Sequence, residues 1–306
     1  MARVLRGDLL AADLCRTVAE GVLRMQGEHG VTPGLAVVLV GQDPASQVYV
    51  ARKMAKATEI GIRSFEHRLP EDTQEGQLLE LIIQLNADPA VHGILVQLPL
   101  PSRFRADKVL NAIDPAKDVD GFHPVNVGRL SVGAAGLIPC TPLGCLMLLD
   151  EVIQHFRGLK AVVIGKSNIV GKPVALLLLE RECTVEVTHI HTRNLPEIVR
   201  TADIVVVAAG SPRLVRGDWV KPGAVVIDVG INRITAPDGR SRIVGDVAAD
   251  EMGHAGVVTP VPGGVGPMTV ACLLSNTLRA AQMAHGEGEC RQDELSSRRR
   301  SKVAAD

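Results

Sequence analysis

Apolar and polar positions along this chain of 306 residues predict two kinds of element. Short apolar runs predict strands that are covered on both faces, and they lie at 35–40, 62–69, 91–96, 161–164, 185–188, 204–207, 224–227 and 256–259. Apolar residues at helical spacing predict helices between these runs, at 8–29, 76–86, 103–112, 140–156, 172–181, 195–201 and 267–284. A further helix, capped by Asp43 or Ser46, carries Lys53. Strands that alternate with helices are typical of a parallel sheet, so we expect an α/β fold.

The loop-rich segment 114–138, which contains many Gly and Pro residues, divides this pattern into two α/β series. We therefore expect a domain with a parallel sheet over residues 1–138 and a second domain over residues 139–268. A last helix follows at 269–284. Residues 285–306 lack apolar periodicity, and we expect them to be disordered.

Composition restricts the class of protein. Aromatic residues make up 2% of the chain and the net charge is −1. These values argue against a base-stacking surface and against attraction to nucleic acid or an anionic membrane. No apolar run is long enough for a membrane span, and the first residues lack the apolar core of a signal segment. The six cysteines show no CxxC spacing and no clustered histidine partner, so we expect a reduced cytoplasmic protein without a metal site.

A glycine-bearing loop opens the second series. The sequence runs from a strand through Gly165-Lys-Ser-Asn-Ile-Val-Gly171 into a helix that has Pro173 in its first turn. Glycine lets a phosphate approach backbone N–H groups at a helix N-terminus, and Ser167 and Asn168 can add donors. The spacing differs from G-x-G-x-x-G, but its place at the start of a βαβ series favours a Rossmann-type nucleotide site over a simple turn.

The loop after the next strand bears on the choice of nucleotide. Folds that bind NAD usually carry a carboxylate there, which holds the ribose 2′-hydroxyl. Here the segment reads His189-Ile-His-Thr-Arg193, without a carboxylate. His191 and Arg193 could instead favour a 2′-phosphate. We therefore expect NADP, with NAD as the less favoured alternative; ordinary exposed loop residues would look the same.

Two further glycine-bearing regions follow strands. Gly210 and Gly230 each stand just after an apolar run, where they could bring backbone close to a ribose and nicotinamide or could simply form tight turns. The segment from Thr259 to Thr269, Thr-Pro-Val-Pro-Gly-Gly-Val-Gly-Pro-Met-Thr, joins the last strand to the last helix. So many Gly and Pro residues predict a site wall near the nicotinamide, where backbone meets ligand.

The candidate catalytic residues lie in the first series. Tyr49 and Lys53 are four residues apart, so they share one face of a helix. The ring could form a wall for an aromatic ligand, and a partly desolvated amine beside it could serve as an acid and base, although a single helical lysine is more often exposed. Gln97, directly after a strand, could hold Lys53. Asp118 and Asp120 could form a capped turn, or one of them could bind an amidine-like ligand edge.

These features together closely resemble one family, the bifunctional methylenetetrahydrofolate dehydrogenase/methenyltetrahydrofolate cyclohydrolases. The resemblance runs in order from about residue 3 to about residue 283, and its motifs are Tyr49-x3-Lys53, Gln97-Leu-Pro-Leu-Pro101, Lys117-Asp-Val-Asp-Gly-Phe-His-Pro-Val-Asn-Val-Gly-Arg-Leu130, Pro139-Cys-Thr-Pro142, the Gly165–Pro173 loop and the Thr259–Thr269 loop. It implies oxidation of 5,10-methylenetetrahydrofolate with NADP and hydrolysis of the methenyl product to 10-formyltetrahydrofolate, as in purine biosynthesis. It also implies a homodimer and a last helix that packs back on the N-terminal domain.

The resemblance assigns roles to individual residues. Lys53 is the acid and base of hydrolysis, Gln97 orients it, Tyr49 stacks on the aminobenzoyl ring and Asp120 holds the pterin edge. Pro262 and Gly263 are expected beside the substrate. The residues expected around the cofactor are Gly165, Lys166, Ser167, Ile169, Val170, Thr192 and Ile231.

Two departures and three alternatives remain. Many relatives have Arg where Lys166 stands, and often Ser or Arg where Ile190 stands, so one donor to a 2′-phosphate is missing here. The alternatives are a dehydrogenase without hydrolysis, a nucleotide-sensing protein with a dead site, and an enzyme like shikimate dehydrogenase. The first two do not explain an intact set of Tyr49, Lys53 and Gln97, and the third would need different polar residues beside its substrate.

Overall fold

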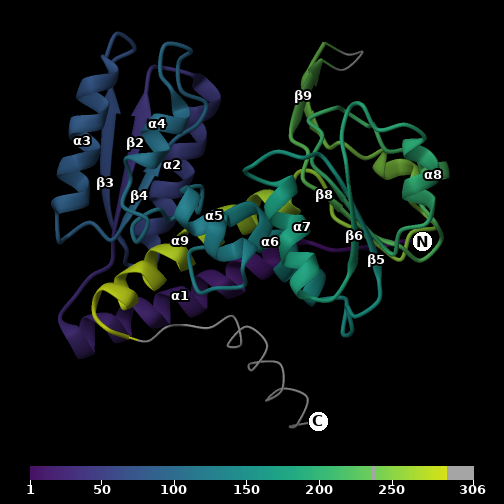
Figure 1. The fold of residues 1–306 in the computed structure, drawn as a ribbon, viewed down its shortest axis with the longest axis horizontal. Coiled ribbons are helices and arrows are strands. Elements are labelled where there is room, and N and C mark those ends of the chain that lie inside the picture. The colour runs from purple at the N-terminus through teal and green to yellow at the C-terminus, as the bar shows by residue number, and fades with distance from the viewer. Residues whose placement is uncertain (236–238, 288–306) are drawn as a thin grey trace. The chain divides into compact units, whose positions relative to one another are not determined.

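The computed structural model describes residues 1–235 and 239–287 (Figure 1). The chain divides into two compact units. The six-stranded unit comprises Met1–Cys15 and Pro139–Leu273, and the three-stranded unit comprises Arg16–Ile138 and the described residues from Leu274 on. Helices α1 (Gly7–His29) and α9 (Val265–Ala284) each contribute residues to both units.

The three-stranded unit is built on a parallel sheet of β2 (Gly34–Val40), β3 (Arg63–Leu69) and β4 (Gly93–Val96), in the order β3-β2-β4. Every residue of β2 is buried, as a central strand of continuous apolar character should be. The connecting helices are α2 (Pro44–Glu59), α3 (Glu75–Ala87), α4 (Ala106–Asn111) and α5 (Pro124–Ser131). One core cluster joins β2 and β4 to α3 and α4, and it includes Val38, Leu78, Ile82, Ile94 and Val109.

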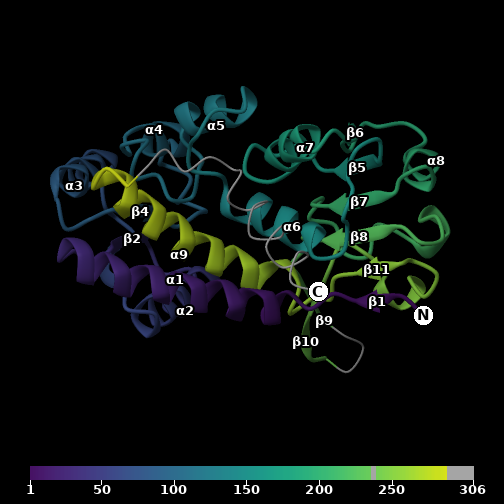
Figure 2. The same ribbon diagram turned by 90° about the horizontal axis from the view of Figure 1, so that it is seen from below.

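The last helix packs within the three-stranded unit over its final turns. The Asn276 side chain donates hydrogen bonds to the backbone oxygens of Val119 (2.9 Å) and Ile138 (2.8 Å). Here α9 runs beside α1 (Figure 2), and a Cβ at Gly21 would stand only 2.4 Å from a methyl carbon of Leu278. This close approach confirms that the last helix packs on the N-terminal part of the chain.

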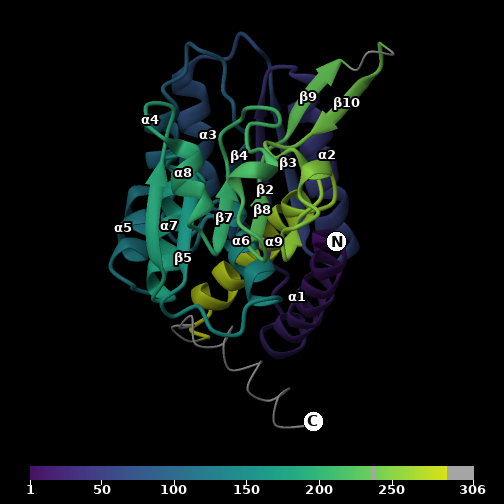
Figure 3. The same cartoon turned by 90° about the vertical axis from the view of Figure 1, so that its right-hand side faces the viewer.

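The six-stranded unit has an entirely parallel main sheet in the order β1-β11-β8-β7-β5-β6. Its strands are β1 (Arg3–Val4), β5 (Lys160–Ile164), β6 (Thr184–Thr188), β7 (Ile204–Val207), β8 (Val225–Asp228) and β11 (Val257–Val258). The helices are α6 (Cys140–Asp150), α7 (Gly171–Glu180) and α8 (Leu195–Arg200), with short 3₁₀ turns at Gly217–Trp219 and Ala249–Glu251. An antiparallel hairpin of β9 (Asn232–Thr235) and β10 (Ser241–Val244) extends away from this sheet (Figure 3).

Strand order places a switch point in each unit. From β5 the chain passes through α7 to β6 on one side, and β7 then pairs on the other side of β5. In the same way, β3 and β4 pair on opposite sides of β2. Ligands of open α/β sheets bind at the carboxyl ends of strands that flank such a reversal. The loops after β5 and β7, and those after β2 and β4, are therefore the places to look for a site.

Several elements differ from the sequence expectations. The expected helix 140–156 ends at Asp150, and Ile153 and Phe156, which continue the apolar spacing, are buried outside the helix. The segment 114–138 contains α5, and the hairpin and β1 have no counterpart among the strands that the apolar pattern predicts. Strand β1 pairs with β11, and Met1–Cys15 have most of their contacts within the six-stranded unit. Most of the expected disordered segment, from residue 288, lies outside the described residues.

Candidate active site

The Lys53 side chain is buried in the three-stranded unit. Helix α2 begins at Pro44, and the Asp43 carboxylate caps it by accepting the Ser46 N–H at 2.7 Å. Lys53 lies on the third turn and is only 5% exposed. Its Nζ stands 5.1 Å from the centroid of the Tyr49 ring, as the i, i+4 spacing predicts. A buried ammonium next to an aromatic face is unusual for a structural lysine, which normally keeps its charge in water.

Gln97 completes this arrangement. It follows β4 directly, and its backbone N–H donates to Val38 O at 2.9 Å, which continues the sheet pairing. Its side-chain Nε2 donates to Leu98 O at 2.6 Å, so the amide presents its oxygen in the other direction. That oxygen accepts a hydrogen bond from Lys53 Nζ at 3.1 Å. The predicted contact between these two residues is therefore present in the structure.

The two aspartates differ in their surroundings. Asp118 is 1% exposed and accepts hydrogen bonds from the His123 backbone (2.8 Å) and the Asn126 side chain (3.0 Å). Burial raises its pKa, against the effect of these bonds. Asp120 is half-buried, and because Asp118 pairs with Ile94 of β4, it lies toward the same end of the strand as Gln97. Asp118 thus closes the loop, whereas Asp120 lies half-buried near the end of β4.

The loop after β5 has the shape that a phosphate needs. Gly165 has a φ of +119°, and a Cβ there would lie 2.2 Å from Ala208 O. A Cβ at Gly171, where α7 begins, would lie 1.9 Å from Gly165 O. Ser167 Oγ accepts from the N–H groups of Val170 (3.2 Å) and Gly171 (3.3 Å). Only glycine fits both positions, which brings the loop backbone to the start of the helix.

Other candidate cofactor residues are exposed around this edge of the sheet. Lys166, Ser167 and Ile169 of the loop face solvent. After β6, Thr192 Oγ1 accepts the His189 N–H at 2.9 Å and shapes the turn, while the side chains of Ile190, His191 and Arg193 remain exposed. Ile231, after β8, is 58% exposed. Within the described turn, histidine and arginine side chains and no carboxylate therefore follow β6.

The glycine-rich loop before α9 is anchored by its backbone. Gly263 has a φ of +98°, and its oxygen accepts from the N–H groups of Gly7 (2.9 Å) and Asp8 (3.2 Å) at the start of α1. Pro262 next to it is exposed. Both residues belong to the six-stranded unit with the phosphate loop, whereas Tyr49, Lys53, Gln97 and Asp120 belong to the three-stranded unit.

Comparison with known proteins then decides the family. The model of the tetrahydrofolate dehydrogenase/cyclohydrolase catalytic domain matches residues 5–120, and that of the NAD(P)-binding domain of the same family matches residues 139–285. The chain belongs to the tetrahydrofolate dehydrogenase/cyclohydrolase family. The two domain models fall on the two α/β series, so both parts of this family's architecture are present.

Relatives and solved structures of this family cover almost the whole chain. The bifunctional protein FolD 1 of Rhizorhabdus wittichii is 72% identical over 94% of this chain and 97% of its own length. The crystal structure of the bifunctional FolD enzyme of Campylobacter jejuni has a TM-score of 0.89 at 46% identity and covers 93% of this chain and 100% of its own. The FolD structure of Trypanosoma brucei, complexed with NADP cofactor and an inhibitor, has a TM-score of 0.89 at 40% identity, over 92% of this chain and 98% of its own.

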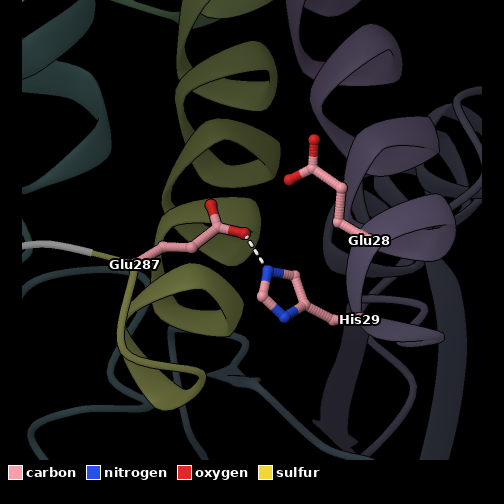
Figure 4. Close-up of side chains that lie close together, drawn as sticks. All are labelled: Glu28, His29 and Glu287. Carbon is pink, nitrogen blue, oxygen red and sulfur yellow. Dashed lines mark hydrogen bonds and ion pairs between the residues drawn. The ribbon is translucent and has the colours of Figure 1, made fainter.

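Outside the family's motifs, one group of side chains could ligate a cation. Glu28 and His29 at the end of α1 approach Glu287 just beyond α9 (Figure 4), and their possible ligand atoms lie within 4.8 Å of one another. His29 Nε2 stands 2.5 Å from Glu287 Oε1, so these two groups already form a pair. Glu28 and His29 are exposed, and exposed ion pairs of this kind contribute little to stability.

Two buried carboxylates are not among the residues that the sequence pattern predicts for the site. Asp228, at the end of β8, and Asp246, just after β10, are 3% and 0% exposed. Both lie close to the loops that follow β7 and β8. Their sequence neighbours gave no signal beyond Gly230, which the sequence analysis had noted as a possible site of close backbone approach.

Proposed function

We propose that this chain oxidises 5,10-methylenetetrahydrofolate with NADP and hydrolyses the 5,10-methenyl product to 10-formyltetrahydrofolate. In the first reaction a hydride leaves the methylene carbon for the nicotinamide ring, and in the second one water is added and one proton is released. The observation that carries the proposal is the buried Lys53 ammonium, which stands between the Tyr49 ring and the Gln97 amide oxygen.

Lys53 is the acid and base of the hydrolytic step in this proposal. Water that adds to the methenyl carbon must lose a proton, and ring opening then requires a proton at the departing nitrogen. A single amine can do both in turn if it is held in place. Gln97 supports this role because its amide can only offer its oxygen to Lys53 while Nε2 is bound to Leu98 O.

Substrate recognition in the proposal uses the residues that the family resemblance assigns to it. Tyr49 stacks on the aminobenzoyl ring, and Gln97 also contacts the substrate. Asp120 accepts hydrogen bonds from the amidine-like pterin edge, a paired contact that suits a half-buried carboxylate. Pro262, which is exposed, and Gly263, which is half-buried, contribute the glycine-rich loop. We assign the folate chemistry to residues 1–138 and nucleotide binding to residues 139–268.

The proposed NADP site lies at the phosphate loop. Gly165, Lys166, Ser167, Ile169 and Val170 hold the phosphates, and Thr192 and Ile231 complete the site. The glycine positions that admit no Cβ support this fit, as does the exposed Arg193 after β6. Bound there, NADP supplies the acceptor for the hydride.

The proposal also includes the oligomeric state and the cellular compartment. We expect a homodimer, as the resemblance implies, and β6 at the sheet edge leaves part of its length exposed. We expect the enzyme to work in the cytoplasm, because the five cysteines within the described ranges are free thiols. No helix within residues 1–235 and 239–287 combines the length and apolar character that crossing a membrane requires.

The proposed function is tested by supplying the purified protein with methylenetetrahydrofolate and either NADP or NAD. Reduced nucleotide and methenyl absorbance are followed together. We expect reduced nucleotide with NADP, a lower kcat/KM with NAD, and methenyl absorbance that decays as the product is hydrolysed. The absence of reduced nucleotide with both cofactors would contradict the proposal.

A further inference from the structure

Asp246 joins two loops of the six-stranded unit that are distant in sequence. Its Oδ2 accepts hydrogen bonds from the backbone N–H groups of Ala209 (2.7 Å) and Gly210 (2.8 Å), in the loop after β7. Its Oδ1 accepts from the side chain of Asn232 (2.8 Å), where the loop after β8 enters the hairpin. One fully buried carboxylate thus satisfies three donors and ties the two loops together.

Asp228 holds Asp246 in turn. Its Oδ1 accepts the N–H groups of Gly230 and Asp246, both at 2.9 Å, and its Oδ2 accepts the Val247 N–H at 3.0 Å. Burial raises the pKa of Asp228 to about 6, while these three bonds favour its charged form. The backbone that carries Asp246 is therefore fixed from the end of β8.

Two glycines make room for these carboxylates. A Cβ at Gly245 would lie 1.8 Å from Asp228 Oδ2, and a Cβ at Gly230 would lie 2.4 Å from the carboxylate carbon of Asp246. No side chain fits either place without moving a carboxylate. The Asp228 and Asp246 carboxylates therefore pack directly against the backbone of these loops.

One of the two loops that Asp246 joins, the loop after β7, stands at the switch point of the sheet. The loop after β7 lies against the phosphate loop, because Gly165 approaches Ala208 O so closely that a Cβ would stand 2.2 Å away. The Ala208 N–H also bonds to Ile164 O, the last residue of β5, at 2.8 Å. A nucleotide at this edge would extend past the backbone at Gly210 and beside Ile231.

We propose that Asp246 is a positioning residue for the NADP site. Its carboxylate fixes the separation between the loop after β7 and the loop after β8, and so the place of the nicotinamide half of the cofactor. This inference rests on the proposed function. Asp246 acts through the Ala209, Gly210 and Asn232 groups that it holds.

The experiment compares Asp246→Ala and Asp246→Asn with a matched control, Asp203→Ala. Asp203 lies just before β7, at the amino end of this strand, and accepts hydrogen bonds from the Lys160 N–H (2.8 Å) and from Lys221 Nζ (2.5 Å). Each full-length protein is measured for its NADP Kd by fluorescence, for NADP KM and kcat in methylenetetrahydrofolate oxidation, and for methenyl hydrolysis without NADP. Hydrolysis serves as a second readout because Lys53 and Gln97 belong to the other unit.

We expect Asp246→Ala to raise the NADP Kd and KM by about tenfold or more, because a loop displaced by a fraction of an ångström misplaces the bound ring. Asp246→Asn keeps one amide oxygen for the Ala209 and Gly210 N–H groups, so its effect should be smaller. Asp203→Ala should leave the NADP Kd within about twofold while it lowers stability. If Asp246→Ala does not fold, Gly230→Ala, whose Cβ would displace the same carboxylate, must raise the Kd instead.

Three results would overturn the inference. The NADP Kd could be unchanged in Asp246→Ala, it could rise equally in Asp203→Ala, or hydrolysis could fall in step with oxidation in Asp246→Ala. If the parent protein does not bind NADP, the proposed function itself is contradicted. This outcome is seen before any variant is measured.

Discussion

His92 shows how a single buried group makes stability depend on pH. It is 5% exposed, and its Nδ1 accepts the Gly34 N–H at 3.0 Å, so the ring is held in its neutral form. Burial lowers its pKa; the nearby His285 and Lys117 add to this shift and Asp88 opposes it. Protonation of Nδ1 would break the bond to Gly34 and place a charge beside other potential cations.

The expected consequence is a loss of stability in acid. Because the folded-state pKa lies below the ordinary value of about 6.5, the unfolded chain binds more protons as the pH falls through that value. The His92 contribution is therefore present above about pH 6.5 and is lost below it, at about 1.4 kcal/mol per unit of pKa lowering. Urea unfolding at pH 7 and pH 5 measures how much the free energy of unfolding falls in acid. This fall should be smaller in His92→Asn than in the parent protein, because the Asn amide oxygen can still accept the Gly34 N–H. Equal losses in parent and variant would show that His92 does not titrate in this way.

Residue-level predictions from the sequence succeeded where partners were local. Tyr49 and Lys53 share a helix turn, so their contact follows from spacing. The burial of Lys53 and its bond to Gln97 depend on packing between α2 and the end of β4, which no local pattern contains. The same holds for Asp246, whose partners at Ala209 and Gly210 lie 37 and 36 residues away. Only the family motifs connected Lys53 with Gln97, and no motif pointed to Asp246.

At the scale of elements, the turn from β5 to α7 carries the nucleotide proposal. Gly165 combines a positive φ with an approach to Ala208 O that leaves no room for a side chain. The β7 loop therefore supports the phosphate loop directly. Any side chain at Gly165 must push these two loops apart.

We expect Gly165→Ala to reduce NADP-dependent oxidation by about tenfold or more and to leave methenyl hydrolysis near the parent rate. Gly158→Ala is the matched control: Gly158 also has a positive φ, +80°, but open space at its Cβ, so it tests backbone strain alone. Steady-state rates with and without NADP distinguish the two. Equal oxidation in both variants would show that the loop contact does not matter for the cofactor.

Elements were predictable wherever their burial matched a simple period. The central strands β2, β5 and β7 are covered on both faces and therefore read as continuous apolar runs. The two-residue β1 and the half-exposed hairpin are too short or too polar for such a signal. Helix α5 begins at Pro124, with the N–H of Val125 bonded to His123 Nδ1, inside a stretch that its Gly and Pro content made resemble a loop.

At the scale of the whole molecule, the proposed function assigns NADP binding and the acid and base of hydrolysis to different units. The phosphate loop and the Asp246 contacts belong to the six-stranded unit, and Lys53 with its partners belongs to the three-stranded unit. Oxidation requires NADP, whereas hydrolysis requires only the methenyl substrate and water. Substitutions in one unit should therefore change the rates of oxidation and hydrolysis by different amounts.

The most direct test of the account is the rate of methenyltetrahydrofolate hydrolysis in Lys53→Met, measured beside Lys56→Met. Lys56 lies on the same helix and pairs with Glu59 at the surface, at 2.7 Å, so its loss controls for a change of charge on α2. The account predicts that Lys53→Met hydrolyses the substrate at least about 100-fold more slowly, and that Lys56→Met keeps the parent rate. Hydrolysis at the parent rate in Lys53→Met would contradict it.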